Sequence, residues 1–304
     1  MKQLFLKAFD DTEIGINVWD EVENPVACVQ IAHGMAEHPD RYDDFAKFLN
    51  SKGYIVAADD HRGRRRGAVG GVNGMVYGDS WVQTLEDMNT LCDYLKTTYG
   101  KQVVLFGHSY GSFLSQRFIE LHSDKLAGAV LSGTAYMKNA LVGMGKIIAS
   151  LQALFCGADK PGKLINKLSF GEYNKPFLRQ GQEFAWLSRD KKEVAKYEAD
   201  PDCGYVLCIG YYLSFFKGVM NMYGKDASNI AKDFRIMIAV GSEDPVSNRS
   251  VLATKLNDFY LGLGLKTEFK VYPGARHEIL NEINRSEVYK DMGNFIDSLF
   301  KAGE

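Results

Sequence analysis

The segment VVLFGHSYGS, residues 103–112, constrains the fold more than any other stretch of the chain. An apolar run long enough for a buried strand stops at Gly107, and Ser109 and Gly111 follow at alternate positions. Glycines flank a serine in this way where the backbone turns so sharply, or packs so closely, that a Cβ atom would clash. The G-x-S-x-G spacing is typical of a strand-to-helix elbow that exposes the serine hydroxyl. We therefore expect a strand before Ser109 and a helix after it.

Strand-like and helix-like segments alternate along the early part of the chain. Two strands, 3–9 and 14–20, are predicted on either side of the turn DDTE. Further on, the pattern predicts apolar strands at 26–34, 54–60, 102–109 and 126–134, with amphipathic helices at 41–53, 80–100 and 112–122. Ser80 is the expected N-cap of the second helix, which ends at Gly100. Such apolar strands alternating with helices predict a mostly parallel sheet with helices on both faces.

The alternation breaks from about Ala135 to Ser228, where no clear strand appears. Helix-like runs at 139–155 and 203–224 surround a loop-rich middle. Regularity then returns, with strands predicted at 234–245 and 266–274 and helices at 249–264 and 286–303. We interpret residues 1–134 and 229–304 as an α/β core, and residues 135–228 as a helical lid inserted over the ends of the strands.

Composition excludes several classes of protein. Of the 304 residues, 46% are hydrophobic and 24% are charged, as in ordinary soluble globular proteins. A net charge of −2 indicates no nucleic-acid partner. The chain has no run of about 20 apolar residues and no secretory signal at its start, so we expect a cytoplasmic protein. Its five cysteines form no CxxC pair, which is typical of reduced thiols.

A serine hydroxyl is a weak nucleophile that needs a neighbouring base, and the base needs an orienting carboxylate. Among the six histidines, His277 follows the last predicted strand and can reach across the sheet edge to Ser109. Asp244, in a turn stiffened by Pro245, is the expected acid, and its neighbour Glu243 is the alternative. The resulting order, serine then acid then histidine, is that of the α/β-hydrolase fold.

Acyl transfer through a serine also needs hydrogen-bond donors for the negatively charged oxygen of the tetrahedral intermediate. The backbone N–H of Tyr110, at the start of the elbow helix, is one expected donor. The second should come from the loop after the strand at 26–34, where Met35 follows His33 and Gly34. Both donors are backbone N–H groups. They are therefore predicted from where each residue lies in the chain and not from the type of its side chain.

Three segments, IAHGMAEHPDRYDDFAKFLNSKGYIVAADDHRG, LFGHSYGS, and GSEDPV with YPGARHEILNE, resemble the monoacylglycerol lipase and lysophospholipase-like branch of the serine α/β-hydrolases. The resemblance covers nearly the whole chain and is loosest in the lid. It implies that Ser109, Asp244 and His277 form a catalytic triad. It also implies that Met35 and Tyr110 donate their N–H groups to the oxyanion. The implied reaction is hydrolysis of a carboxylic ester through an acyl-serine, without a cofactor.

The expected substrates are monoacylglycerols or lysophospholipids with medium or long acyl chains. The lid is rich in Met, Leu, Phe and Tyr, which suits an acyl chain, and a further hypothesis is that the lid transiently contacts a lipid surface. A general carboxylesterase, an acyl thioesterase or a related peptidase would share the same triad. A non-catalytic binding protein on a hydrolase scaffold is the alternative from another class. No oligomeric state is predicted.

The chain departs from the family in one place. After DHRG the family often continues with His-Gly and a small hydroxyl residue, whereas this chain has Arg64–Arg66. We interpret the arginine run as a solvated loop, with a phosphate or acidic headgroup site as the alternative. His33, Glu37 and His38 in HGMAEH suggest a metal, but their spacing fits no common zinc motif. A loop that orders the oxyanion hole explains them better, and no metal site is predicted.

Overall fold

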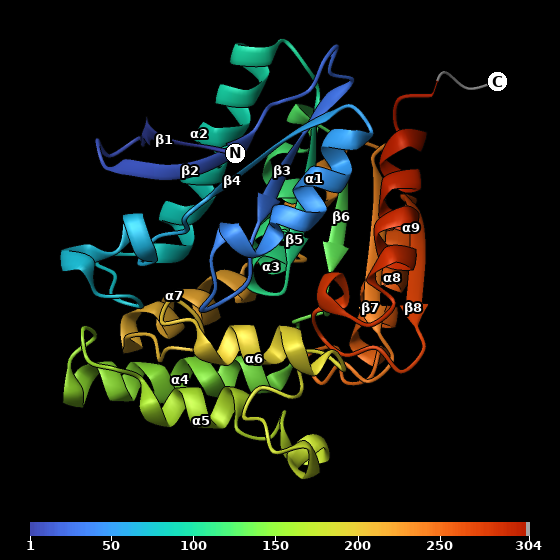
Figure 1. Ribbon diagram of the computed structural model, residues 1–304. Coiled ribbons are helices and arrows are strands. Elements are labelled where there is room, and N and C mark those ends of the chain that lie inside the picture. Colours follow the sequence, from blue (N-terminus) through green and yellow to red (C-terminus); the bar gives the residue numbers. More distant parts are fainter. Residues whose placement is uncertain (302–304) are drawn as a thin grey trace.

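The computed structural model describes residues 1–301 and contains an eight-stranded sheet covered by helices on both faces (Figure 1). The strands lie in the order β1-β2-β4-β3-β5-β6-β7-β8. Their bounds are β1 (Lys2–Lys7), β2 (Glu13–Trp19), β3 (Ala27–Ala32), β4 (Tyr54–Asp59), β5 (Val103–His108), β6 (Leu126–Ser132), β7 (Arg235–Gly241) and β8 (Lys266–Tyr272). β2 pairs antiparallel with β1 and β4, and all other neighbours are parallel. The predicted mostly parallel sheet is confirmed.

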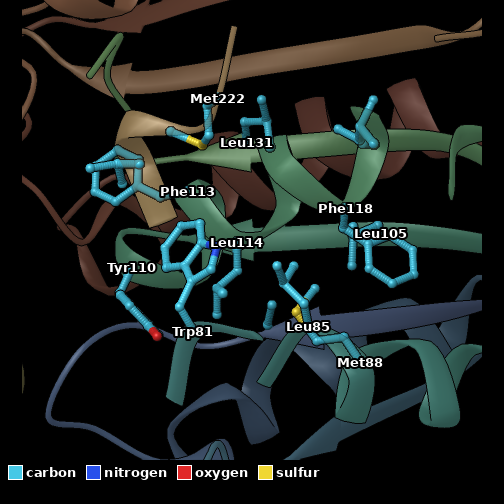
Figure 2. Close-up of a cluster of buried hydrophobic side chains, with 14 of the residues drawn as sticks. Trp81, Leu85, Met88, Leu105, Tyr110, Phe113, Leu114, Phe118, Leu131 and Met222 are labelled. Carbon is cyan, nitrogen blue, oxygen red and sulfur yellow. The ribbon is translucent and has the colours of Figure 1, made fainter. Parts of the chain in front are cut away.

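Helices cover both faces of this sheet because its buried strands present apolar side chains alternately to either side. In β3, Val29 and Ile31 pack beneath α1 (Asp43–Ser51) and α9 (Arg285–Ser298). Cys28 and Ala32 face α2 (Ser80–Tyr99), α3 (Tyr110–His122) and α8 (Val251–Gly262). Figure 2 shows the second cluster, in which side chains of α2 and α3 interdigitate. Each fully buried Leu or Phe there stabilises the fold by about 1.5–3 kcal/mol.

The predicted ends of α2 can be compared with the observed ones. The predicted end at Gly100 is confirmed, since this residue adopts a left-handed conformation (φ 63°) and its N–H donates to the carbonyl of Lys96. The predicted N-cap was wrong by one residue. Asp79 is the cap, and its carboxylate accepts the N–H of Val82, whereas Ser80 is the first helical residue.

The segment 135–228, which we call the helical insertion, lies between β6 and β7 and gathers at one end of the sheet (Figure 1). Its helices are α4 (Ala140–Cys156), α5 (Lys163–Phe170), α6 (Lys191–Ala199) and α7 (Ile209–Met220). The helix predicted at 139–155 is confirmed, but the one predicted at 203–224 was too long. Residues 203–208 are not helical because Gly204 (φ 70°) and Cys208 donate their N–H groups to the carbonyls of Ala36 and Gly74 instead.

The last predicted helix, 286–303, corresponds to α9, which ends at Ser298. Residues 302 and 303 of that prediction lie outside the described residues. Throughout residues 1–301, every helix is too short or too polar to cross a lipid bilayer.

The direction of chain winding reverses between β3 and β5, which are adjacent in the sheet although α1, β4 and α2 separate them in sequence. Their carboxyl ends therefore meet, with Ala32 paired to Gly107. A crevice at such a reversal is the usual ligand position in open α/β sheets. The elbow crosses this point so closely that a Cβ on Gly111 would lie 2.0 Å from the carbonyl oxygen of Ala32. A Cβ on Gly107 would lie 2.2 Å from Ser115 Oγ.

This close approach predicts that Gly111→Ala lowers the free energy of unfolding by about 3 kcal/mol, because backbone atoms of β3 would have to move. Urea unfolding followed by circular dichroism measures the change. Gly143→Ala is the matched control, since a Cβ there meets no atom within 4 Å and α4 should gain about 0.5–1 kcal/mol. Equal stability of the two variants would contradict the account of the elbow.

Candidate active site

Ser109 occupies the turn between β5 and α3 in a conformation that a serine rarely adopts, with φ 52° and ψ −118°. The fold holds this strained backbone on both sides. Its N–H donates to the carbonyl of Ser132 at the end of β6, at 3.0 Å. Its own carbonyl accepts the N–H of Ser112 at 2.8 Å. The side chain of Ser109 is partly exposed, as a nucleophile at the carboxyl edge of the sheet would need.

The two expected oxyanion donors lie on the loops that begin at the meeting point of β3 and β5. Tyr110 is the first residue of α3, so its N–H is at the positive end of a helix dipole. Met35 follows β3 and is half-buried. Within residues 1–301, neither N–H has a hydrogen-bond partner. Both are therefore available to a negatively charged oxygen bound beside Ser109.

The structure brings His277 and Asp244 together. His277 Nδ1 lies 3.0 Å from Asp244 Oδ1, which also accepts the N–H of Val246 at 2.8 Å. Both side chains are buried, at 2% and 0% exposure. A Cβ on Gly133, the residue after the Ser132 carbonyl that anchors the elbow, would lie 3.0 Å from His277 Cε1. The histidine ring is therefore close to the strand end that holds the elbow.

The alternative acid, Glu243, does not lie against the histidine. Its side chain is 43% exposed and sits 3.5 Å from Arg249. Sequence alone could not separate these two neighbouring carboxylates, because both lie in the turn that follows β7. Burial and the hydrogen bond to His277 separate them in the structure.

The electrostatics of the two neighbouring histidines differ. Burial alone would lower the pKa of His277, but the charge and hydrogen bond of Asp244 outweigh it and raise the pKa above its ordinary value of 6.5. His108, whose ring centroid is 4.9 Å from that of His277, is also fully buried. Its burial, together with the charge of His277, lowers its pKa to about 4. At neutral pH His108 is therefore uncharged, and only His277 has an orienting carboxylate.

A buried ion network that the sequence did not reveal joins the loop after β3 to the loop after β8. Arg41 donates to both carboxylate oxygens of Glu278, at 2.7 and 2.6 Å, and also to Glu37. Glu37 in turn accepts the N–H of Gly34 at 2.5 Å, next to Met35. Although burial opposes it, Arg41 lowers the pKa of Glu278 to about 2. The sequence analysis predicted none of these three residues as partners, because Glu278 lies more than two hundred residues from Arg41.

The helical insertion contacts both the loop after β3 and the loop after β8. On the histidine loop, the N–H of Glu278 donates to the carbonyl of Leu187 at 2.7 Å, and Trp186 packs 5.1 Å from the His277 ring. On the loop after β3, the carbonyl of Ala36 accepts from the hydroxyl of Tyr197 at 3.1 Å. The insertion thus contacts the loops that carry the predicted base, His277, and one predicted oxyanion donor, Met35.

One group of side chains has the composition of a metal site. Ligand atoms of His38, Asp200 and Cys203 lie within 4.8 Å of one another. Both ring nitrogens of His38 already have partners, since Nε2 lies 2.9 Å from Asp200 and Nδ1 lies 3.1 Å from Arg65. With a guanidinium on one side, this group acts as a hydrogen-bonded connection between the loop after β3 and the insertion, and we assign it no ion.

The arginine run is not the solvated loop that we expected. Arg62 pairs with Asp87 at 2.5 Å, Arg65 with Asp40 at 2.9 Å, and Arg66 with Asp60. Arg64 is completely buried. The interpretation as a solvated loop was therefore wrong, because acidic and aromatic side chains from distant parts of the chain enclose these residues.

The elbow, the buried histidine–aspartate pair and the eight-stranded sheet together define a serine α/β-hydrolase. Comparison with known proteins is consistent with this class. The family described as serine aminopeptidase, S33, matches residues 23–284, and the chain belongs to this family.

Among curated relatives, the monoacylglycerol lipase of Mycolicibacterium smegmatis is 27% identical over 289 residues, which covers 93% of this chain and 92% of that protein. A monoglyceride lipase homolog of Monkeypox virus is 25% identical, with 94% and 95% covered. Among solved structures, a thermostable carboxyl esterase from Bacillus coagulans superimposes with a TM-score of 0.89 at 24% identity, covering 99% of both chains. These structural likenesses confirm the α/β-hydrolase fold.

The raised pKa of His277 predicts the acid limb of the pH profile. A base must be uncharged, so kcat/KM should rise with pH through an apparent pKa above 6.5. In Asp244→Asn the amide no longer stabilises the imidazolium, so the limb should move to lower pH while kcat falls by about 10⁴-fold. Glu243→Gln is the matched control and should leave both the limb and the rate unchanged. A larger loss in Glu243→Gln would assign the acid to Glu243.

Proposed function

We propose that this serine ester hydrolase cleaves monoacylglycerol or lysophospholipid esters of medium or long acyl chains, with Ser109, His277 and Asp244 as its catalytic triad. The observation that carries the proposal is the buried 3.0 Å contact between His277 and Asp244, at the same sheet edge as the serine elbow. Serine hydrolases use such a pair to activate a hydroxyl that has no other source of reactivity.

In the first half of the reaction, Ser109 Oγ attacks the ester carbonyl carbon while His277 Nε2 takes the hydroxyl proton. Asp244 accepts the Nδ1–H of the same ring, which leaves Nε2 unprotonated and stabilises the imidazolium that forms. The carbonyl oxygen becomes negatively charged and accepts hydrogen bonds from the N–H groups of Tyr110 and Met35. One such donor is worth about 3–4 kcal/mol in a protease case.

The intermediate then collapses. The carbon–oxygen bond to the alcohol breaks, and His277 gives its proton to the leaving alkoxide, so that an acyl-Ser109 and a free alcohol result. In the second half a water molecule attacks the acyl carbon while His277 takes its proton. The Ser109 oxygen leaves with that proton, and the fatty acid is released. Every proton transfer in the two halves of the reaction thus passes through Nε2 of His277, and no cofactor takes part.

The charges around the site favour an ester over a peptide with a free amino terminus. An aminopeptidase needs an uncompensated carboxylate near its nucleophile to hold the substrate ammonium group. The carboxylates of Glu37 and Glu278, on the loops after β3 and β8, both pair with Arg41, so neither is left without a cationic partner. The full-length relatives from Mycolicibacterium smegmatis and Monkeypox virus bear lipase names, which supports the same substrate class.

We also propose that residues 135–228 act as a lid on a core formed by 1–134 and 229–304, and that the lid contacts lipid surfaces transiently. Its helix α4 presents an outward row of apolar side chains, each at least 50% exposed: Leu141, Met144, Ile147, Leu151, Leu154 and Phe155. A groove of about 360 Å³ runs along this row to Met220 of α7. An exposed apolar patch of this kind marks a surface that binds apolar partners.

Hydrolysis rates over a series of p-nitrophenyl esters from acetate to palmitate test the substrate class. We expect kcat/KM to peak at a medium or long chain, because each buried methylene adds about 0.8 kcal/mol of binding. With 1-lauroylglycerol, the rate should rise further once the substrate exceeds its critical micelle concentration. A maximum at acetate would indicate a general carboxylesterase, and preference for the matched thioesters an acyl thioesterase.

The double variant Leu154→Ser, Phe155→Ser separates the lid surface from the catalytic site. It should remove the rise at the critical micelle concentration and leave hydrolysis of monomeric substrate unchanged. Val82→Ser is the control, since Val82 is also an exposed apolar residue but lies on α2. If the wild-type rate does not rise above the critical micelle concentration, the proposed lipid contact is wrong while the esterase assignment stands.

A further inference from the structure

Arg64 differs from the other arginines of its loop because it is a buried cation without a carboxylate. It stands where the family often has a histidine, and its side chain is 0% exposed. Its neighbours Arg62, Arg65 and Arg66 each pair with at least one aspartate. Among residues 1–301, no acidic side chain comes within ion-pair distance of Arg64. An unpaired charge taken out of water is costly, so its presence calls for a partner.

The groups that surround Arg64 are phenols. Its guanidinium donates to the hydroxyl oxygens of Tyr205 and Tyr211 in the helical insertion, at 2.8 and 2.6 Å. It also lies over the ring of Tyr211, 4.9 Å from the centroid. Burial raises the pKa of both tyrosines, so neither supplies a negative charge at neutral pH. The Nε of Arg64 has no hydrogen-bond partner among the described residues.

This cluster adjoins the catalytic serine through Tyr110. The ring of Tyr110 lies 5.3 Å from that of Tyr211, and Tyr110 directly follows Ser109 in the chain. The Tyr110 hydroxyl is buried and also lacks a hydrogen-bond partner within residues 1–301. Burial raises its pKa to about 12, so it remains a donor at neutral pH. A cationic N–H and a phenolic O–H without acceptors thus lie in the same buried region beside the nucleophile.

We propose that Arg64, together with the hydroxyls of Tyr110, Tyr205 and Tyr211, binds a negatively charged oxygen group of the substrate. A carboxylate or a phosphate supplies both the missing charge and the missing acceptors. The inference rests on the proposed ester hydrolysis and adds that Arg64 determines specificity for anionic esters. The anion can belong to the alcohol side, as in a lysophospholipid phosphate, or to the far end of the acyl chain.

Three esters with the same acyl length distinguish these sources: 1-lauroylglycerol, which is neutral; 1-lauroyl lysophosphatidic acid, with phosphate on the alcohol side; and the monoglyceryl ester of dodecanedioic acid, with a terminal carboxylate. We expect Arg64→Met to lower kcat/KM for one of the charged esters by about tenfold or more relative to 1-lauroylglycerol, since a charge-assisted hydrogen bond is lost. Arg64→Lys should retain much of the preference. The ester that responds identifies the side on which the anion binds.

Tyr211→Phe provides a second test that keeps the packing of the cluster. It removes only the hydroxyl that contacts Arg64 and should reduce the same charged-to-neutral ratio. Tyr212→Phe is the matched control on the same helix, because the Tyr212 hydroxyl bonds Asn166 and should leave the ratio unchanged. If Arg64→Met fails to fold, this pair decides the question.

Equal effects of Arg64→Met on all three esters, or none on any, would overturn the proposal and leave Arg64 as a purely structural residue. The result is separable from the proposed substrate class. If wild-type enzyme does not hydrolyse 1-lauroylglycerol, the same ratio is measured with p-nitrophenyl butyrate and mono-p-nitrophenyl succinate. A tenfold change there supports the anion site even though the lipase assignment has failed.

Discussion

The rest of the structure depends on the close backbone contact between the serine elbow and β3. Only a residue without a Cβ fits at Gly111, against the carbonyl of Ala32, and only such a residue fits at Gly107 on the strand before it. This contact holds Ser109 in its unusual backbone conformation and packs the start of α3 against the end of β3. It also brings the first N–H of α3 close to the loop after β3. The positions of the proposed nucleophile and of the proposed oxyanion donors therefore follow from one packing constraint.

A second layer of organisation is electrostatic. The loop after β3 and the loop after β8 come from opposite ends of the chain, and Arg41 holds them together through Glu37 and Glu278. Buried ions of this kind contribute little net stability, because desolvation cancels most of their attraction. Their effect here is geometric. They hold in place Gly34, the residue before Met35, and Glu278, the residue after His277. Arg64 lacks this compensation, which is why it points to a ligand.

Much of the fold could be predicted from the sequence because its signals are local. Apolar strands alternating with amphipathic helices specify a parallel sheet, and the glycine spacing specifies the elbow. The sequence could not decide between two adjacent residues that both make good N-caps, and the structure has Asp79 rather than Ser80 as the N-cap of α2. The acid and histidine were predicted from their positions directly after the last two predicted strands. The assignment of the site residues to catalysis stays a prediction until it is tested.

The parts that could not be predicted depend on contacts between distant segments. The stretch 203–208 was predicted to be helical, but the N–H of Gly204 donates to the carbonyl of Ala36 in the loop after β3. Arg64 looked solvated, but Tyr205 and Tyr211, more than a hundred residues further on, enclose it. The role of Glu278 is likewise invisible without Arg41 beside it. In each case the local sequence pattern gave no sign of the distant contact, and tertiary packing determined the outcome.

The central claim is that the fold activates Ser109 through His277. Labelling of the intact protein with a fluorophosphonate, followed by mass spectrometry of the labelled peptide, tests it most directly, because the reagent reacts only with an activated serine. We predict modification at Ser109 in the wild-type protein and its loss in His277→Ala, with Tyr212→Phe labelled normally. Absence of labelling in the folded wild-type protein, or equal labelling in His277→Ala, would contradict the account and favour a non-catalytic binding protein on this scaffold.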